Sequence, residues 1–171
     1  MELVSTLSPD HAADSIRPTM EGIMKKTGKI SSMLGTLAHA PDMFQAFLAV
    51  NATMGKTKLD GKLREEAYLL TSILNDCHYC VHYHTLACKR VGVEDAKIAE
   101  LQRYETSDLF NELEKDVLRF AEQSTRKIAV DPALASRLRE ALGEREYVEL
   151  AFVVASANLT TRYNVALGND I

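Results

Sequence analysis

"LNDCHYCVHYHTLACKRVGV", residues 74–93, holds all three cysteines of the 171-residue chain and three of its five histidines. Side chains three, four or seven residues apart share one face of a helix. Cys77, Cys80 and His84 follow those steps, so two thiols and an imidazole would stand together at the start of a helix. Partial positive charge at a helix N-terminus and an imidazole one turn away both favour the thiolate, the nucleophilic form of cysteine. The stretch therefore predicts a helix that carries a reactive dithiol, with Cys88 further along the same stripe as a small core residue.

The rest of the chain shows helical periodicity, and no segment alternates as a strand does. We expect an all-α fold of seven to nine helices in a single domain that spans residues 1–171. Capping residues and apolar spacing place the helix starts at or just after Ser8-Pro9, Ile30, Pro41, Leu63, Asn75-Asp76, Glu94, Ser107, Asp131-Pro132 and Glu144. Glycines at positions 28, 92 and 143 are expected to end the helices before them.

Composition and charge exclude several classes of protein. The formal net charge is −4 and the basic residues are scattered, which disfavours nucleic-acid binding. The start of the chain has no positive segment followed by an apolar core, so we expect no signal peptide. The most apolar stretch, residues 147–159, is too short to span a membrane and carries Glu149. We therefore expect a soluble, cytoplasmic protein that binds neither nucleic acid nor membranes.

The cysteine pair has several interpretations. In a reducing compartment a Cys-X-X-Cys motif indicates metal binding or redox chemistry more often than a structural disulfide. A zinc site built from Cys77, Cys80 and His84 would need a fourth ligand, but His78 and His82 point around the helix away from this stripe. A thioredoxin-type motif needs a βαβ setting, which an all-helical chain lacks. We therefore favour a redox-active dithiol and expect neither a metal nor an organic cofactor.

Two acidic residues, Glu65 and Glu66, precede the cysteines on an otherwise apolar helix. They could simply complement the dipole at the start of that helix. Alternatively, one of them could reach His84, orient its ring and raise its basicity. If the two helices were continuous, Glu66 would share a face with Cys77, whereas a break at residues 75–76 would allow Glu65 to reach the imidazole.

The complete pattern is Glu65, eleven residues, Cys77-His78-Tyr79-Cys80, three residues and His84. It resembles the signature of the alkylhydroperoxidase D / carboxymuconolactone decarboxylase family. The similarity extends to the flanking segments "GKISSMLGTLAHAPDMFQAFLAVNATMG" and "ELAFVVASANLTTRYNVALG", and covers roughly residues 16–169. The resemblance implies an all-α fold that assembles as a homotrimer or homohexamer.

The resemblance also implies roles for the site residues. By position, Cys80 attacks the peroxide, Cys77 resolves the sulfenic acid as a disulfide, His84 is the base and Glu65 orients it. The family spacing thus selects Glu65. One position departs from the well-studied peroxidases, which place a relay histidine where this chain has Tyr79. The decarboxylase branch generally lacks the cysteine pair.

We therefore predict a thiol-dependent peroxidase in antioxidant defence, with a small-molecule peroxide as substrate and an unidentified dithiol as electron donor. One alternative is a carboxymuconolactone decarboxylase-like enzyme in which His84 and Glu65 act as acid–base groups. Two others are a zinc-stabilised interaction module and a protein that senses redox state without repeated turnover.

Overall fold

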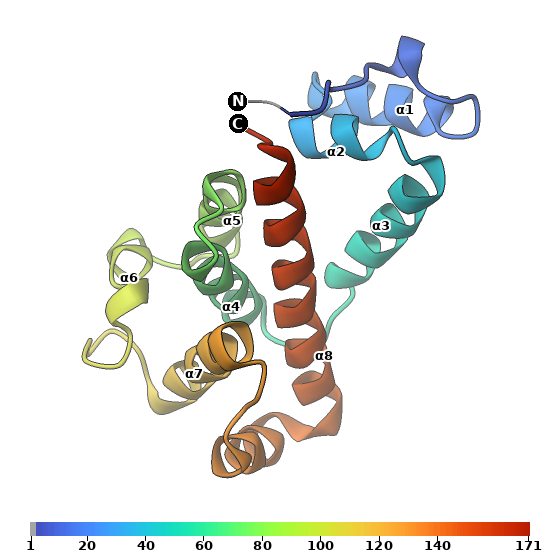
Figure 1. Cartoon of the computed structure of the whole chain (residues 1–171). Coiled ribbons are helices and arrows are strands. Elements are labelled where there is room, and N and C mark those ends of the chain that lie inside the picture. The colour runs from blue at the N-terminus through green and yellow to red at the C-terminus, as the bar shows by residue number, and fades with distance from the viewer. Residues whose placement is uncertain (1–2) are drawn as a thin grey trace. The chain divides into compact units, whose positions relative to one another are not determined.

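The computed structural model describes residues 3–171, and every regular element among them is a helix (Figure 1). The α-helices are α1 (Arg17–Thr27), α2 (Ser32–Leu37), α3 (Pro41–Met54), α4 (Gly61–Leu74), α5 (His78–Arg90), α6 (Asp95–Ala99), α7 (Glu112–Lys127) and α8 (Pro132–Leu167). Two short 3₁₀-helices, η1 (Pro9–His11) and η2 (Leu101–Arg103), complete the set. The prediction of an all-α fold is confirmed. No helix in residues 3–171 combines the length and the apolar character that crossing a membrane requires.

The chain forms two compact units. The N-terminal unit comprises residues 3–56 together with 164–171, and the motif unit comprises residues 57–163. All the candidate site residues belong to the motif unit. The single domain over residues 1–171 and the oligomeric state both stay predictions.

In the N-terminal unit, the first long helix begins later than the sequence suggests. Pro9 opens only the short η1, and α1 starts at Arg17 with Pro18 in its first turn. A helix continuous through Pro18 would lose a hydrogen bond and bring the proline ring against the preceding turn. Proline in the first turn carries no such cost, because the N–H it lacks has no partner there. Gly28 ends α1 with a φ of 79°, as expected.

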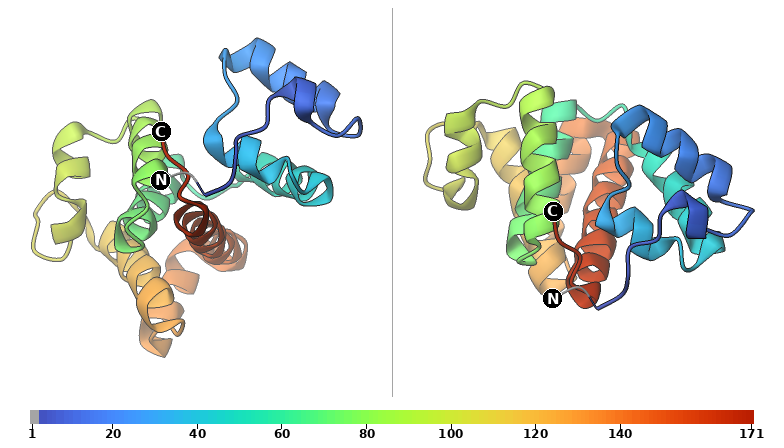
Figure 2. Two further views of the ribbon diagram at one scale, coloured as in Figure 1. Left: turned by 45° about the horizontal axis from the view of Figure 1, so that its top comes forward. Right: turned by 90° about the horizontal axis from the view of Figure 1, so that it is seen from above.

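The motif unit is built around α4, which packs against both α5 and α7 (Figure 1). Figure 2 shows α6 and the loop after it, in yellow-green, at one edge of this unit. The core is aliphatic, and its fully buried members include Leu69, Leu70, Val117, Leu118, Leu138, Leu150 and Val154. Burial of each such side chain stabilises the fold by roughly 1.5–3 kcal/mol. The contacts with α5 and α7 therefore hold α4 on two sides.

The start of α7 corrects one expectation. Its N-cap is Asn111, not Ser107. The Asn111 side chain accepts the N–H of Glu114, and the Glu114 carboxylate accepts the N–H of Asn111 in return. Position 107 lacks this reciprocal pair because Phe110 stands where the glutamate would be needed. Ser107 instead accepts the N–H of Leu109 in a turn.

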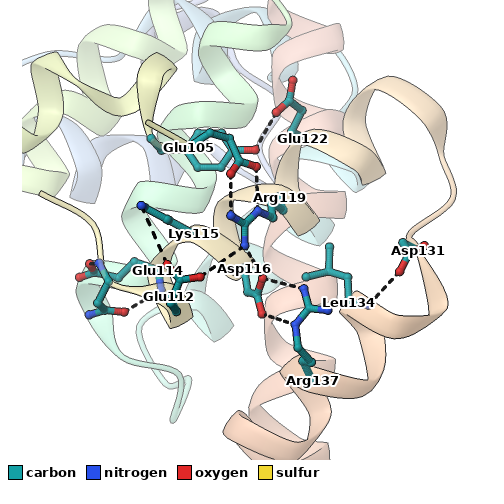
Figure 3. Close-up of polar contacts among 12 residues, drawn as sticks. Glu105, Glu112, Glu114, Lys115, Asp116, Arg119, Glu122, Asp131, Leu134 and Arg137 are labelled. Carbon is teal, nitrogen blue, oxygen red and sulfur yellow. Dashed lines mark hydrogen bonds and ion pairs between the residues drawn. The ribbon is translucent and has the colours of Figure 1, made fainter. Parts of the chain in front are cut away.

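An ionic network joins α7 to the start of α8. Asp116 accepts hydrogen bonds from Arg119 at 2.8 Å and from Arg137 at 2.9 Å. Figure 3 shows Arg119 between Glu105 and Asp116. Hydrogen bonds from Arg137 and Arg119 hold the pKa of Asp116 below its ordinary value, so this carboxylate stays ionised.

The expected start and interruption of α8 are both present. Asp131 caps the helix by accepting the N–H groups of Ala133 and Leu134 at 2.9 and 3.0 Å. Gly143 interrupts it with φ 76° and ψ 167°, so the segment before it and the segment after it differ in direction. The second segment supplies Asn158, Thr160 and Thr161 to the site described next.

Candidate functional site: a thiol pair beside a glutamate–histidine pair

A break in the chain separates α4 from the cysteine helix. Asn75 ends α4, and Asp76 adopts a left-handed conformation with a φ of 52°. Cys77 is itself the N-cap of α5, and its Sγ accepts the N–H of Cys80 at 3.3 Å. The Asn75 amide donates to Asn158 and Thr161, each at 2.9 Å, which ties the break to α8. The break therefore fixes where the first thiol sits relative to the helix that follows.

The two thiols of the motif lie together and are almost completely buried. Cys77 is 1% exposed and Cys80 is 3% exposed, and neither forms a disulfide. A hydrogen bond from the Cys80 side chain lowers the pKa of Cys77, the backbone N–H of Cys80 adds to this, and burial opposes it. The lowered pKa favours the thiolate form of Cys77 at the start of α5.

A glutamate–histidine pair lies one helical turn along α5. His84 Nδ1 and Glu65 Oε2 are 2.9 Å apart, and Arg64 donates to the other Glu65 oxygen at 3.0 Å. Burial raises the pKa of Glu65, but the hydrogen bonds and charges of His84 and Arg64 outweigh it and hold the pKa below its ordinary value. An ionised Glu65 on Nδ1 leaves Nε2 as the nitrogen that can exchange protons with a reacting group.

Tyr68, which is not among the residues predicted from the sequence, covers one face of the imidazole. The rings of Tyr68 and His84 are stacked, with centroids 3.5 Å apart and planes 13° apart. The Tyr68 hydroxyl lies 2.5 Å from Thr160 Oγ1 on α8. The available signal was the spacing from Glu65, since residues three apart on α4 share a face.

Glu66 lies on another side of α4, away from His84. Its side chain is 1% exposed, and its Oε1 lies 3.4 Å from Lys97 Nζ. Lys97 also forms an ion pair with Glu114. These groups line a pocket of about 160 Å³, and burial raises the pKa of Glu66 to about 7. The glutamate that contacts the histidine is therefore Glu65.

The remaining cysteine and histidines of the motif stretch lie outside this cluster. Cys88 is fully buried, and burial raises its pKa to about 12, so it remains a thiol. His78 is exposed, 3.9 Å from Asp76, and His82 is exposed with its ring nearly perpendicular to that of Tyr83. Within residues 3–171 no group of three or more His, Cys, Asp or Glu side chains is placed to hold a metal ion.

Comparison with known proteins finds a family model that matches part of the chain. The model of the carboxymuconolactone decarboxylase family matches residues 41–123. Over these residues the chain is similar to that family. YdfG of Bacillus subtilis strain 168, an uncharacterized protein, is 25% identical to this chain over 132 residues, which is 76% of this chain and 90% of YdfG.

Solved structures share the fold over almost the whole chain. A peroxidase-related protein from Ralstonia eutropha JMP134, described as an alkylhydroperoxidase AhpD core, has a TM-score of 0.85 at 25% identity and covers 99% of this chain and 91% of its own. The debrominase Bmp8 has a TM-score of 0.83 at 24% identity with the same coverage. The predicted AhpD-like fold is confirmed. Because proteins of this fold differ in activity, the reaction of this protein depends on its own residues.

Proposed function

We propose that this protein is a thiol peroxidase that reduces hydroperoxides through Cys77 and Cys80. The observation that carries the proposal is the adjacency, in one unit, of a hydrogen-bonded thiol pair and the Glu65–His84 pair. Neither feature needs a metal, and both serve thiolate chemistry.

The first step oxidises Cys80. Cys80 donates its proton toward Cys77 in the resting pair and must lose it before it attacks. His84, one turn away on α5, is the base, and Glu65 holds its ring. The Cys80 thiolate attacks one peroxide oxygen, so an S–O bond forms as the O–O bond breaks. The alkoxide leaves, takes a proton from the histidine and departs as the alcohol, and Cys80 becomes a sulfenic acid.

The second step closes the disulfide. The Cys77 thiolate attacks the Cys80 sulfur, and hydroxide leaves and is protonated to water. The N-cap contact already holds Cys77 Sγ against the backbone of Cys80. A dithiol donor then reduces the disulfide by thiol–disulfide exchange. We further propose that this occurs in the cytoplasm, where reduced cysteines persist, and that the protein is a homotrimer or homohexamer.

To test this proposal, the reduced protein is reacted with cumene hydroperoxide and its remaining free thiols are counted. Cys77 and Cys80 should be lost together and recovered by peptide mapping as one disulfide, while Cys88 stays a thiol. Cys80→Ser should abolish peroxide consumption, and Cys77→Ser should stop at a sulfenic acid that dimedone traps. Cys88→Ser is the matched control and should react normally. If both motif thiols survive while a known peroxidase in the same buffer is oxidised, the proposal is wrong.

The Glu65–His84 pair also favours a second candidate, an acid–base enzyme of the decarboxylase type. That reaction would use the imidazole alone, so Cys80→Ser would retain turnover of the lactone substrate. The buried thiol pair would then have no part in catalysis, which is why we rank this candidate below the peroxidase.

A further inference from the structure

We infer that Tyr68 is a positioning residue that fixes the orientation and the tautomer of the His84 imidazole. The inference rests on the proposed function, because it assigns Tyr68 to the proton-transfer step of the same site.

One hydrogen bond does not fix a ring. The 2.9 Å contact between His84 Nδ1 and Glu65 leaves the imidazole free to pivot about the line that joins the two atoms. The Tyr68 ring, 3.5 Å away and only 13° from parallel, blocks that rotation on one face. Glu65 at the edge and Tyr68 on the face together define one ring plane, and therefore one direction for Nε2.

Tyr68 is held by a hydrogen bond whose direction follows from proton counting. Thr160 Oγ1 has one proton, which it directs to the carbonyl groups of Ser156 and Ala157 at 3.0 and 3.1 Å. With the Thr160 proton on these carbonyls, the Tyr68 hydroxyl is the donor in its 2.5 Å contact with Thr160. The phenol proton is thus engaged with α8 and does not compete for the imidazole or the thiols.

The surroundings keep Tyr68 neutral. Burial raises the pKa of Tyr68 far above its ordinary value, the Thr160 contact lowers it by less, and the nearby Cys80, Glu65 and Cys77 raise it further. The ring therefore acts as a fixed apolar wall beside the thiol pair rather than as an acid. A wall of this kind keeps solvent from the covered face of His84.

The test separates the ring from the hydroxyl. Tyr68→Phe keeps the stack and removes the bond to Thr160, and Thr160→Val removes the same bond from the other side. We expect both to lower the rate of thiol oxidation by less than about threefold. Tyr68→Leu removes the stack, and we expect it to lower kcat by about tenfold to 100-fold with little change in KM, because the base is misplaced.

A second readout does not depend on peroxide turnover. ¹⁵N NMR of histidine-labelled protein should show His84 in one tautomer, with Nδ1 protonated, in the wild type and in Tyr68→Phe. Tyr68→Leu should show a mixture of tautomers. If peroxide is never consumed but the tautomers mix, the positioning role stands and the proposed peroxidase function fails.

Folding controls keep both readouts interpretable. Tyr147→Leu removes another ring from the motif unit, one that packs edge-on against Phe120, and it should change neither rate nor tautomer. If Tyr68→Leu does not fold, Tyr68→Met fills the same site with a flexible side chain and is measured in its place. A folded Leu or Met variant with the wild-type rate and a single tautomer would overturn the inference.

Discussion

Glu65 and Glu66 are neighbours on α4, yet the surroundings on the two sides of this helix shift the pKa values of their buried carboxylates in opposite directions. The pKa of Glu65 is lowered, whereas that of Glu66 is raised to about 7. Successive side chains on a helix point about 100° apart, so one residue faces α5 and the other faces the Lys97 pocket. Burial acts in the same direction on both, so the difference comes from their partners.

The number of partners decides the outcome. Glu65 has two cationic or hydrogen-bonding neighbours of its own, His84 and Arg64. Glu66 has only a share of Lys97, because Lys97 is also paired with Glu114, whose charge raises the pKa of Glu66 further. Neither oxygen of Glu66 has a hydrogen-bond partner among the described residues. A buried acid is thus kept ionised only where its charge is fully compensated.

The largest expected effect separates the two glutamates by activity. Glu65→Gln should slow peroxide-driven thiol oxidation by about 100-fold or more, because an amide neither fixes the Nδ1-protonated tautomer nor supports a positive imidazolium. Glu66→Gln should stay within about twofold of the wild type, since Glu66 makes no contact with His84. Stopped-flow oxidation of the reduced proteins at one pH measures both. Equal losses in the two variants would break the comparison and assign Glu66 to the site.

The sequence could predict the all-α fold and the identity of the cluster. The periodicity of thiols and imidazole placed Cys77, Cys80 and His84 on one face, and the family spacing selected Glu65. Helical spacing alone could not choose between Glu65 and Glu66. The choice depends on the break at Asp76, whose positive φ is rare for a residue other than glycine. The break resets the direction of α5, and a tertiary contact from Asn75 to α8 holds it.

Other features were not predicted from the sequence, for two different reasons. The partners of Tyr68 and Glu66 come from elements distant in sequence, Thr160 on α8 and Lys97 on α6, and no local pattern reports such contacts. The N-cap of α7 was within reach of sequence reasoning. Asn111 has a glutamate three residues later, which is the signature of a capping box, whereas Ser107 does not.

The second prediction compares the same two variants by stability. The folded-state pKa of Glu66, about 7, lies above the ordinary value of 4.5, so the folded state binds this proton more tightly than the unfolded state does. The free energy of unfolding should therefore fall as pH rises from about 4.5 to 7 and stay reduced above that. Glu66→Gln should remove this loss and stabilise the protein by about 2–3 kcal/mol at pH 8.5, with little effect near pH 4.5.

Glu65 should behave in the opposite sense. Because folding lowers the pKa of Glu65, the ionised side chain stabilises the folded state at pH values above its ordinary pKa of 4.5. This stabilisation is lost as pH falls through the folded-state pKa. Glu65→Gln should therefore destabilise the protein at pH 8.5. Urea unfolding of the wild type and both variants at pH 4.5 and 8.5 measures these differences. A shift of the same sign in both variants at pH 8.5 would show that the two carboxylates do not differ as the structure indicates.

The smallest expected effect tests why Lys97 fails to compensate Glu66. Glu114 accepts from Lys97 and from the backbone N–H of Asn111, so it holds the ammonium group and caps α7 at once. Glu114→Gln should remove the competing charge, lower the pKa of Glu66 and flatten the loss of stability between pH 4.5 and 7. Weakening of the capping box should cost about 1 kcal/mol at every pH.

Asn111→Ala is the matched control for that variant, because it removes the side-chain cap but keeps Glu114 and the backbone N–H that Glu114 accepts. It should cost about 1 kcal/mol with the wild-type pH dependence. Both variants should oxidise their motif thiols at the wild-type rate, since the Glu65 side of α4 is untouched. If Glu114→Gln left the pH dependence unchanged, competition for Lys97 could not be the reason that Glu66 resists ionisation. Desolvation alone would then have to account for the contrast with Glu65.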